Sequence, residues 1–208
     1  MRTKSFLVAV LLTALALPAF AISSFGQAPA GGPPPTTNVR GKIVKLDGQN
    51  LTVKTREGST VNVALAPNAQ IRALKTEKLS DIKQGDFIAS TSMKGKDGKL
   101  HAIEIHTLPP AAPELQIPYD YAQGSIMTNA HVSGIAKAKS GNVVSVTYKG
   151  QSTDIVVDNK TKIVAPTDAA MSDLKPGKAV FIRANKGGDG SLSANNVTVE
   201  KNGVKPPM

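Results

Sequence analysis

The chain has 208 residues and no cysteine, and 25 Lys and Arg outweigh 15 Asp and Glu for a formal net charge of +10. The lack of cysteine excludes disulfide bonds, thiolate metal sites, cysteine nucleophiles and the lipid anchor of bacterial lipoproteins. The lysines are scattered, which favours a role in solubility, with binding to an anionic envelope surface as the alternative.

The first 21 residues have the pattern of a signal peptide. Arg2 and Lys4 precede an apolar run at residues 6–17, and the small-x-small sequence at residues 19–21 follows Pro18. The run is too short to span a bilayer comfortably, and no other stretch is long and apolar enough to do so. We predict cleavage after Ala21, export to the periplasm or the medium, and no membrane span.

Residues 22–38 are rich in Pro, Gly and Thr and predict a flexible tether. Two copies of one template follow, and we assign them to domains at residues 39–107 and 131–203. Gly41 matches Gly134 at an offset of 93 positions, and from Gly58 onward the offset is 92. A fixed offset through glycines, turns and apolar positions indicates an internal repeat.

Apolar residues alternate with polar ones within each copy, which indicates strands, and Asp-Gly pairs mark hairpin turns. Residues 72–84 and 164–176 are the only segments without this pattern, and we expect a short helical plug in each. Three strands, a plug and a final hairpin is the order of an OB-type barrel, whose closure removes exposed strand edges. The sequence therefore predicts an all-β protein with two tandem five-stranded OB-like barrels.

The alternation also predicts the core. Phe87 and Ala89 align with Ala179 and Phe181, so a large and a small residue exchange places on what we expect to be one inward face. The residues predicted to be buried are Val53, Val63, Ile71, Ile82, Phe87, Ile105, Val146, Ile155, Ile163, Leu174, Phe181 and Val197.

One motif recurs before the fourth strand of each copy, at residues 79–85 (LSDIKQG) and 171–177 (MSDLKPG). With the glycine turns and the final Asp-Gly hairpin, it resembles a family of exported bacterial OB-like domains catalogued only as a domain of unknown function. The resemblance implies an exported, non-enzymatic protein and supplies no functional residues. Asp81 and Asp173 in the motif are expected to accept hydrogen bonds from local backbone N–H groups.

Glu104 and His106 lie two positions apart on a predicted strand and so share a face. With His131 they form a candidate metal site, and the alternative is that all three are ordinary surface residues. No Gly-x-Ser-x-Gly elbow and no distinct pair of catalytic acids are present, so we predict no enzyme activity and no cofactor.

The connector at residues 108–130 carries Tyr119, Tyr121, Ile126 and Met127, which are costly to leave in water. It either packs between the barrels or lines a binding cleft with Asp120 as a polar anchor. Tyr148 is the aromatic residue expected on an exposed strand, so the candidate ligand-binding residues are Tyr119, Asp120, Tyr121 and Tyr148. So few aromatic platforms argue against nucleic acid as a partner.

These features predict a non-catalytic binding module of the bacterial envelope, with an anionic envelope component or another envelope protein as its partner. The alternative is a structural or protein-interaction module that docks through barrel edges or the connector. Residues 204–208 are predicted to be a disordered end.

Overall fold

The computed structural model describes residues 35–138 and 141–206, which all belong to one unit of the chain, residues 34–208. The predicted signal peptide, most of the predicted tether and the last two residues lie outside the described residues. Thr36 already begins the first strand, so the prediction of a tether through residue 38 is wrong for residues 36–38.

The described residues are almost entirely strands, which confirms the all-β prediction. The strands are β1 Thr36–Asp47, β2 Asn50–Thr55, β3 Thr60–Thr76, β4 Phe87–Lys94, β5 Leu100–Thr107, β6 Leu115–Pro118, β7 Ser125–Ala138, β8 Gly141–Tyr148, β9 Gln151–Val157, β10 Lys162–Asp168, β11 Ala179–Lys186 and β12 Leu192–Val199. Two 3₁₀ helices, η1 Leu79–Asp81 and η2 Met171–Asp173, precede β4 and β11. The predicted Asp-Gly hairpins have the expected positive φ, 77° at Gly98 and 83° at Gly190.

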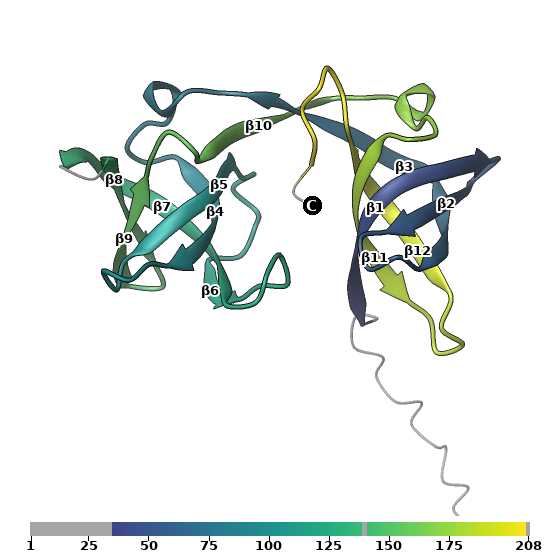
Figure 1. Ribbon diagram of the computed structural model, residues 1–208, viewed down its shortest axis with the longest axis horizontal. Coiled ribbons are helices and arrows are strands. Elements are labelled where there is room, and N and C mark those ends of the chain that lie inside the picture. The colour runs from purple at the N-terminus through teal and green to yellow at the C-terminus, as the bar shows by residue number, and fades with distance from the viewer. Residues whose placement is uncertain (1–34, 139–140, 207–208) are drawn as a thin grey trace, which may run out of the picture. The chain divides into compact units, whose positions relative to one another are not determined.

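The first barrel consists of β1, β2, β3, β12 and β11 (Figure 1). Antiparallel pairing joins β1 to β2, β2 to β3, β12 to β11 and β11 back to β1, and β3 pairs with β12 in parallel. This closed ring has the strand order of an OB-type barrel. Its last two strands, however, come from the second copy of the repeat.

The second barrel is the counterpart, with β7, β8 and β9 from the second copy and β5 and β4 from the first. It closes through a short parallel pairing of β5 with β9. Each copy therefore contributes three strands to one barrel and two strands to the other. The expectation that residues 39–107 and 131–203 each close on their own does not match this exchange of strands.

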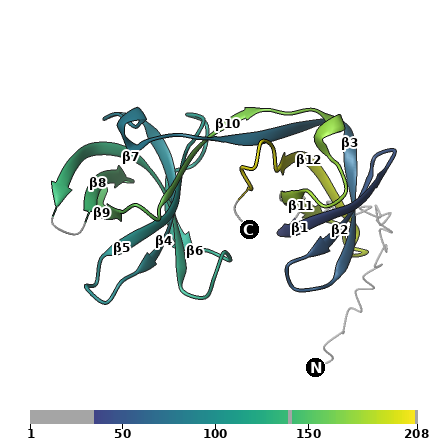
Figure 2. The same cartoon turned by 45° about the horizontal axis from the view of Figure 1, so that its top comes forward.

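The two copies cross through β3 and β10, which pair with each other in an antiparallel bridge (Figure 2). β3 continues from the first barrel to Thr76, and β10 continues from its parallel pairing with β5 to Asp168. This pairing explains why the predicted plugs are too long, because residues 72–76 and 164–168 are strand. The shorter plugs that remain pack in the same barrel as the exchanged hairpin that comes after them in the chain. Ile82 therefore packs in the second barrel and Leu174 in the first.

Eleven of the twelve residues predicted to be buried are buried, and ten of them pack inside the barrels as expected. The two phenylalanines do not. Phe181 is only half-buried, and Phe87 is buried but stacks on His131, with ring centroids 4.6 Å apart. Ile88 and Ile182 face the barrel interiors instead. The prediction chose the wrong face because residues 87–92 of β4 are buried on both faces, which removes the contrast between them.

Hydrogen bonds also correct the alignment of the two copies in their first strand. Ile43 N donates to Lys178 O (2.9 Å) and Gly177 N donates to Ile43 O (2.8 Å). Val132 makes the same two bonds with Asp86 and Gly85, at 2.9 and 2.8 Å. Ile43 and Val132 are therefore equivalent and 89 positions apart, whereas the sequence alignment placed this strand at an offset of 93. The difference of four residues lies in the β7–β8 hairpin, which is longer than the β1–β2 hairpin.

The end of the described chain is more ordered than the sequence predicts. Lys201 and Val204 form a bridge, and Pro206 is buried, so the predicted disordered end does not begin at residue 204. No helix within residues 35–138 and 141–206 has the length and apolar character needed to cross a bilayer.

Candidate binding cleft between the two barrels

A cleft of about 620 Å³ lies where the two barrels and the bridge meet. Its lining includes Phe181 from the first barrel, Met127 from the second, and Leu74 and Pro166 from the bridge. Because the bridge exists only through the exchange of strands, the cleft is a product of that exchange.

Equivalent rows of residues run across the cleft sides of the two barrels, and all of them except Arg40 and Val164 line the cleft itself. In the first barrel, Arg40, Phe181, Thr198 and Arg72 are direct neighbours on β1, β11, β12 and β3. The corresponding row in the second barrel is Asn129, Ala89, His106 and Val164, on β7, β4, β5 and β10. Directly paired residues share a sheet face. The two walls therefore have the same backbone geometry and different chemistry.

The connector adds a hairpin to the wall of the second barrel. β6 pairs with β7, and the turn between them, residues 119–124, reaches the first barrel. The Ser125 hydroxyl fixes this turn, because it donates to the Tyr119 carbonyl (2.7 Å) and accepts from Ala122 N–H (3.1 Å). The turn thus presents Asp120 to β1.

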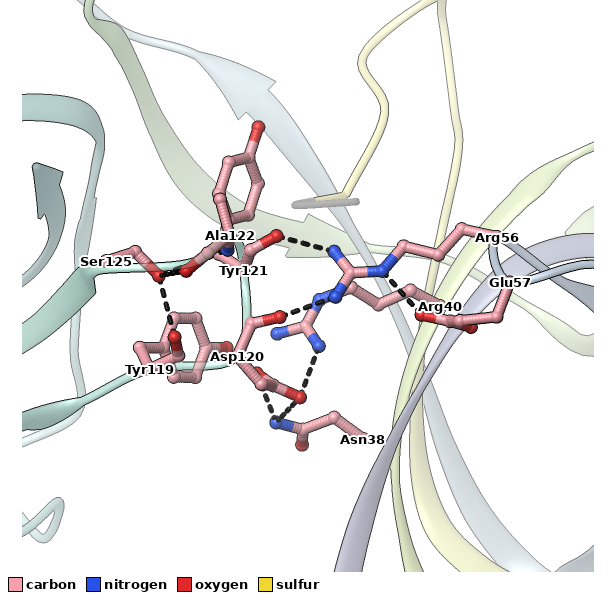
Figure 3. Close-up of polar contacts among 9 residues, drawn as sticks. All are labelled: Asn38, Arg40, Arg56, Glu57, Tyr119, Asp120, Tyr121, Ala122 and Ser125. Carbon is pink, nitrogen blue, oxygen red and sulfur yellow. Dashed lines mark hydrogen bonds and ion pairs between the residues drawn. The ribbon is translucent and has the colours of Figure 1, made fainter.

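Asp120 is the polar centre of the contact between the barrels (Figure 3). Its carboxylate accepts a hydrogen bond from Arg40 Nη1 at 2.8 Å and two from Asn38 Nδ2 at 3.0 and 3.1 Å. Partial burial raises the pKa of Asp120, but the bonds from Arg40 and Asn38 outweigh it and hold that pKa below its usual value. Arg56 adds a bond to the carbonyl oxygen of Tyr121 at 2.7 Å.

Arg40 is a buried charge, with 2% of the residue exposed. Its guanidinium carbon lies 5.1 Å from the ring centroid of Tyr119 and 4.8 Å from that of Phe181. The negative faces of the two rings stabilise the cation where water cannot. Arg40 Nε and Nη2 have no hydrogen-bond partner among the described residues, so Asp120 is the principal polar partner of this guanidinium.

The structure separates the three residues predicted to hold a metal. Glu104 is buried, and its Oε1 lies 3.7 Å from Nδ1 of His106, which lines the cleft. His131 instead pairs with Glu114, with 3.5 Å between Nε2 and Oε1, and stacks on Phe87. The described ranges contain no group of three or more His, Cys, Asp or Glu side chains that could hold a metal ion.

The four predicted ligand-binding residues have different positions. Tyr119 and Asp120 line the cleft, while Tyr121 is half-buried and contributes its carbonyl oxygen to Arg56. Tyr148 is not on an exposed face. It is 9% exposed within the core of the second barrel, because the alternation along β8 places it on the inward face with Val144 and Val146.

Sequence reasoning missed the arginines of the cleft, Arg72 and Arg183, and the role of Phe181. Differences between the two copies could have indicated them. Arg72 aligns with Val164, and Arg183 aligns with Thr91, at the offset of 92 that the second half of each copy keeps.

No protein-family model, no curated protein and no solved structure matches this chain.

Proposed function

We propose that the protein is a non-catalytic binding module of the bacterial envelope whose ligand occupies the cleft between the barrels. The observation that carries this proposal is the cleft itself, whose volume of about 620 Å³ is typical of small-molecule sites. Apolar side chains such as Leu74, Leu115 and Met127 form about half of its lining, and polar and charged side chains form the rest. The signal-peptide pattern supports an envelope location.

The state of the carboxylate in the cleft supports binding rather than catalysis. Asp120 is held by Arg40 and Asn38, and its pKa lies below the usual value. A carboxylate fixed in its charged form by an arginine is a poor general acid or base near neutral pH. It is well suited to fix the geometry of the cleft.

A second candidate is docking of another envelope protein on the connector. β6 has one paired edge, against β7, and Ile117 within it is 46% exposed. An exposed apolar residue on a short outer strand is a feature of protein-docking surfaces.

The uncharged fluorescent dye N-phenyl-1-naphthylamine tests the proposed binding function, because the chain has no tryptophan to interfere. Ile117→Gln changes a residue of the cleft, and Ile135→Gln makes the same change at a residue of similar exposure, 40%, outside the cleft lining. We expect saturable binding that Ile117→Gln weakens severalfold and Ile135→Gln leaves unchanged. Absence of saturable binding, or equal effects of the two variants, would refute the cleft as the site.

A further inference from the structure

We infer that the cleft selects an amphiphilic anion and holds the anionic head on the wall of the first barrel, at Arg72 and Arg183. This inference rests on the proposed binding function and adds the chemical class and the orientation of the ligand.

The repeat provides an internal control for which residues the fold requires. Most inward positions keep their apolar character in both copies, as at Ile71 and Ile163 or Ile105 and Val197, which are all buried. The cleft rows change at every position, from Arg40, Phe181, Thr198 and Arg72 to Asn129, Ala89, His106 and Val164. One barrel frame thus accepts either row, so the fold itself does not require this particular set of residues.

The difference between the walls is mainly one of charge. Arg72 and Arg183 both line the cleft, whereas their equivalents in the second barrel are Val164 and Thr91. Arg72 donates to Gln70 Oε1 at 2.7 Å, and Arg183 Nε donates to Thr36 Oγ1 at 3.3 Å. Neither arginine forms an ion pair with the described residues.

The acidic groups nearby form no ion pair with these arginines among the described residues. Asp120 is bound to Arg40 and Asn38, and Glu104 is buried beside His106 on the opposite wall. Asp168 is opposite Arg72 in the bridge, but no ion pair joins their side chains. Two guanidinium groups therefore remain available, and their planar donors match the oxygens of carboxylate, sulfonate or phosphate groups.

The apolar part of the lining defines the other end of the ligand. Leu74, Pro166, Leu115, Ile117 and Met127 form an apolar surface along the bridge and the second barrel. An apolar body gains free energy in proportion to the surface that it buries there. A ligand with a charged head and an apolar body satisfies both walls at once.

Two dyes with the same apolar body test the inference. 8-Anilino-1-naphthalenesulfonate carries a sulfonate, and N-phenyl-1-naphthylamine carries no charge. We expect the sulfonate dye to bind the mature protein more tightly, and Arg72→Gln and Arg183→Gln each to weaken it by about tenfold or more, as for loss of a charge-assisted hydrogen bond. The affinity for the uncharged dye should not change. Lys160→Gln, which removes one exposed charge outside the cleft lining, is the matched control.

The outcomes separate the inference from the proposed function. Equal affinities for the two dyes that neither arginine variant changes would overturn the anion inference and leave the binding function intact. Failure of both dyes to bind would overturn both. Displacement of the sulfonate dye by dodecanoate or by 2-naphthoate then distinguishes a lipid chain from an aromatic acid as the apolar body.

Discussion

Leu74 and Pro166 face each other at the centre of the β3–β10 bridge, and they are equivalent residues of the two copies, 92 positions apart. The pairs on either side are symmetric, because Arg72 is opposite Asp168 and Thr76 is opposite Val164. The bridge therefore has a local pseudo-two-fold axis through Leu74 and Pro166. A crossing of this kind is the geometry of a domain-swapped dimer, formed here within one chain.

The exchange of strands predicts that the two halves of the chain stay together after cleavage. A protease site inserted between Ala111 and Ala112 would separate β1–β5 from β6–β12. Each barrel needs strands from both fragments, so we expect the cleaved protein to elute from a size-exclusion column as one species of unchanged size. The chain has no cysteine, so a disulfide could not hold the fragments together.

Guanidinium chloride provides the control, since the fragments should separate once they are unfolded. Two folded species that separate under native conditions would show that each copy closes on its own.

Adjacent residues of β11 should differ sharply in their contribution to stability. Ile182 is fully buried in the core of the first barrel, whereas Phe181 faces the cleft against Arg40. Ile182→Ala should lower the free energy of unfolding by about 2–5 kcal/mol, and Phe181→Ala should lower it by less, because the cleft side leaves no enclosed cavity. Chemical denaturation of both variants measures the difference. A larger loss for Phe181→Ala would place it in the core after all.

Much of the fold was predictable from periodicity, because most inward strand positions are apolar in both copies, with the buried Ser90 and Ser92 of β4 as exceptions. Ile71, Ile163 and Ile105 are examples of the apolar positions. The exchange of strands was not predictable, since a hairpin that follows a plug can pair with either copy when the two copies have the same pattern. The sequence alignment of the first strand, at Ile43, was wrong for a similar reason. The second hairpin is longer by four residues, and an even number leaves the alternation of apolar and polar residues unchanged.

The cleft was predictable only in part. The composition of the connector indicated that Tyr119 and Asp120 have partners, but both a packed connector and a cleft fit that composition. Arg72 and Arg183 looked like ordinary solvated cations, because their place on the wall depends on the crossing of β3 and β10. Tyr148 was misplaced because an aromatic residue at the end of a strand suits either face.

The Arg40–Asp120 contact should stabilise the protein mainly by satisfying a buried charge. Asp120→Ala removes the carboxylate and leaves Arg40 buried without it, so we expect a loss of about 1–3 kcal/mol in the free energy of unfolding. In an Arg40→Met background no charge remains to be satisfied, and the same substitution should cost much less. A double-mutant cycle by chemical denaturation measures this coupling. Equal costs in the two backgrounds would mean that the contact contributes nothing to stability.

The same contact predicts a loss of stability in acid. Partial burial raises the pKa of Asp120, but the hydrogen bonds from Arg40 and Asn38 outweigh it, so the folded-state pKa lies below the unfolded value of about 3.9. A carboxyl group with a depressed pKa binds protons more readily in the unfolded chain. Its contribution is therefore complete above about pH 4 and is lost as the pH falls through the folded-state pKa.

Asp97, Asp173 and Asp189 also have depressed pKa values, so the pH dependence of the wild type alone does not isolate the contribution of Asp120. We expect the difference in unfolding free energy between wild type and Asp120→Asn to be constant from pH 7 to pH 5 and to shrink below pH 4. A difference that stays constant down to pH 3 would show that the carboxylate of Asp120 gains nothing from Arg40 and Asn38 on folding.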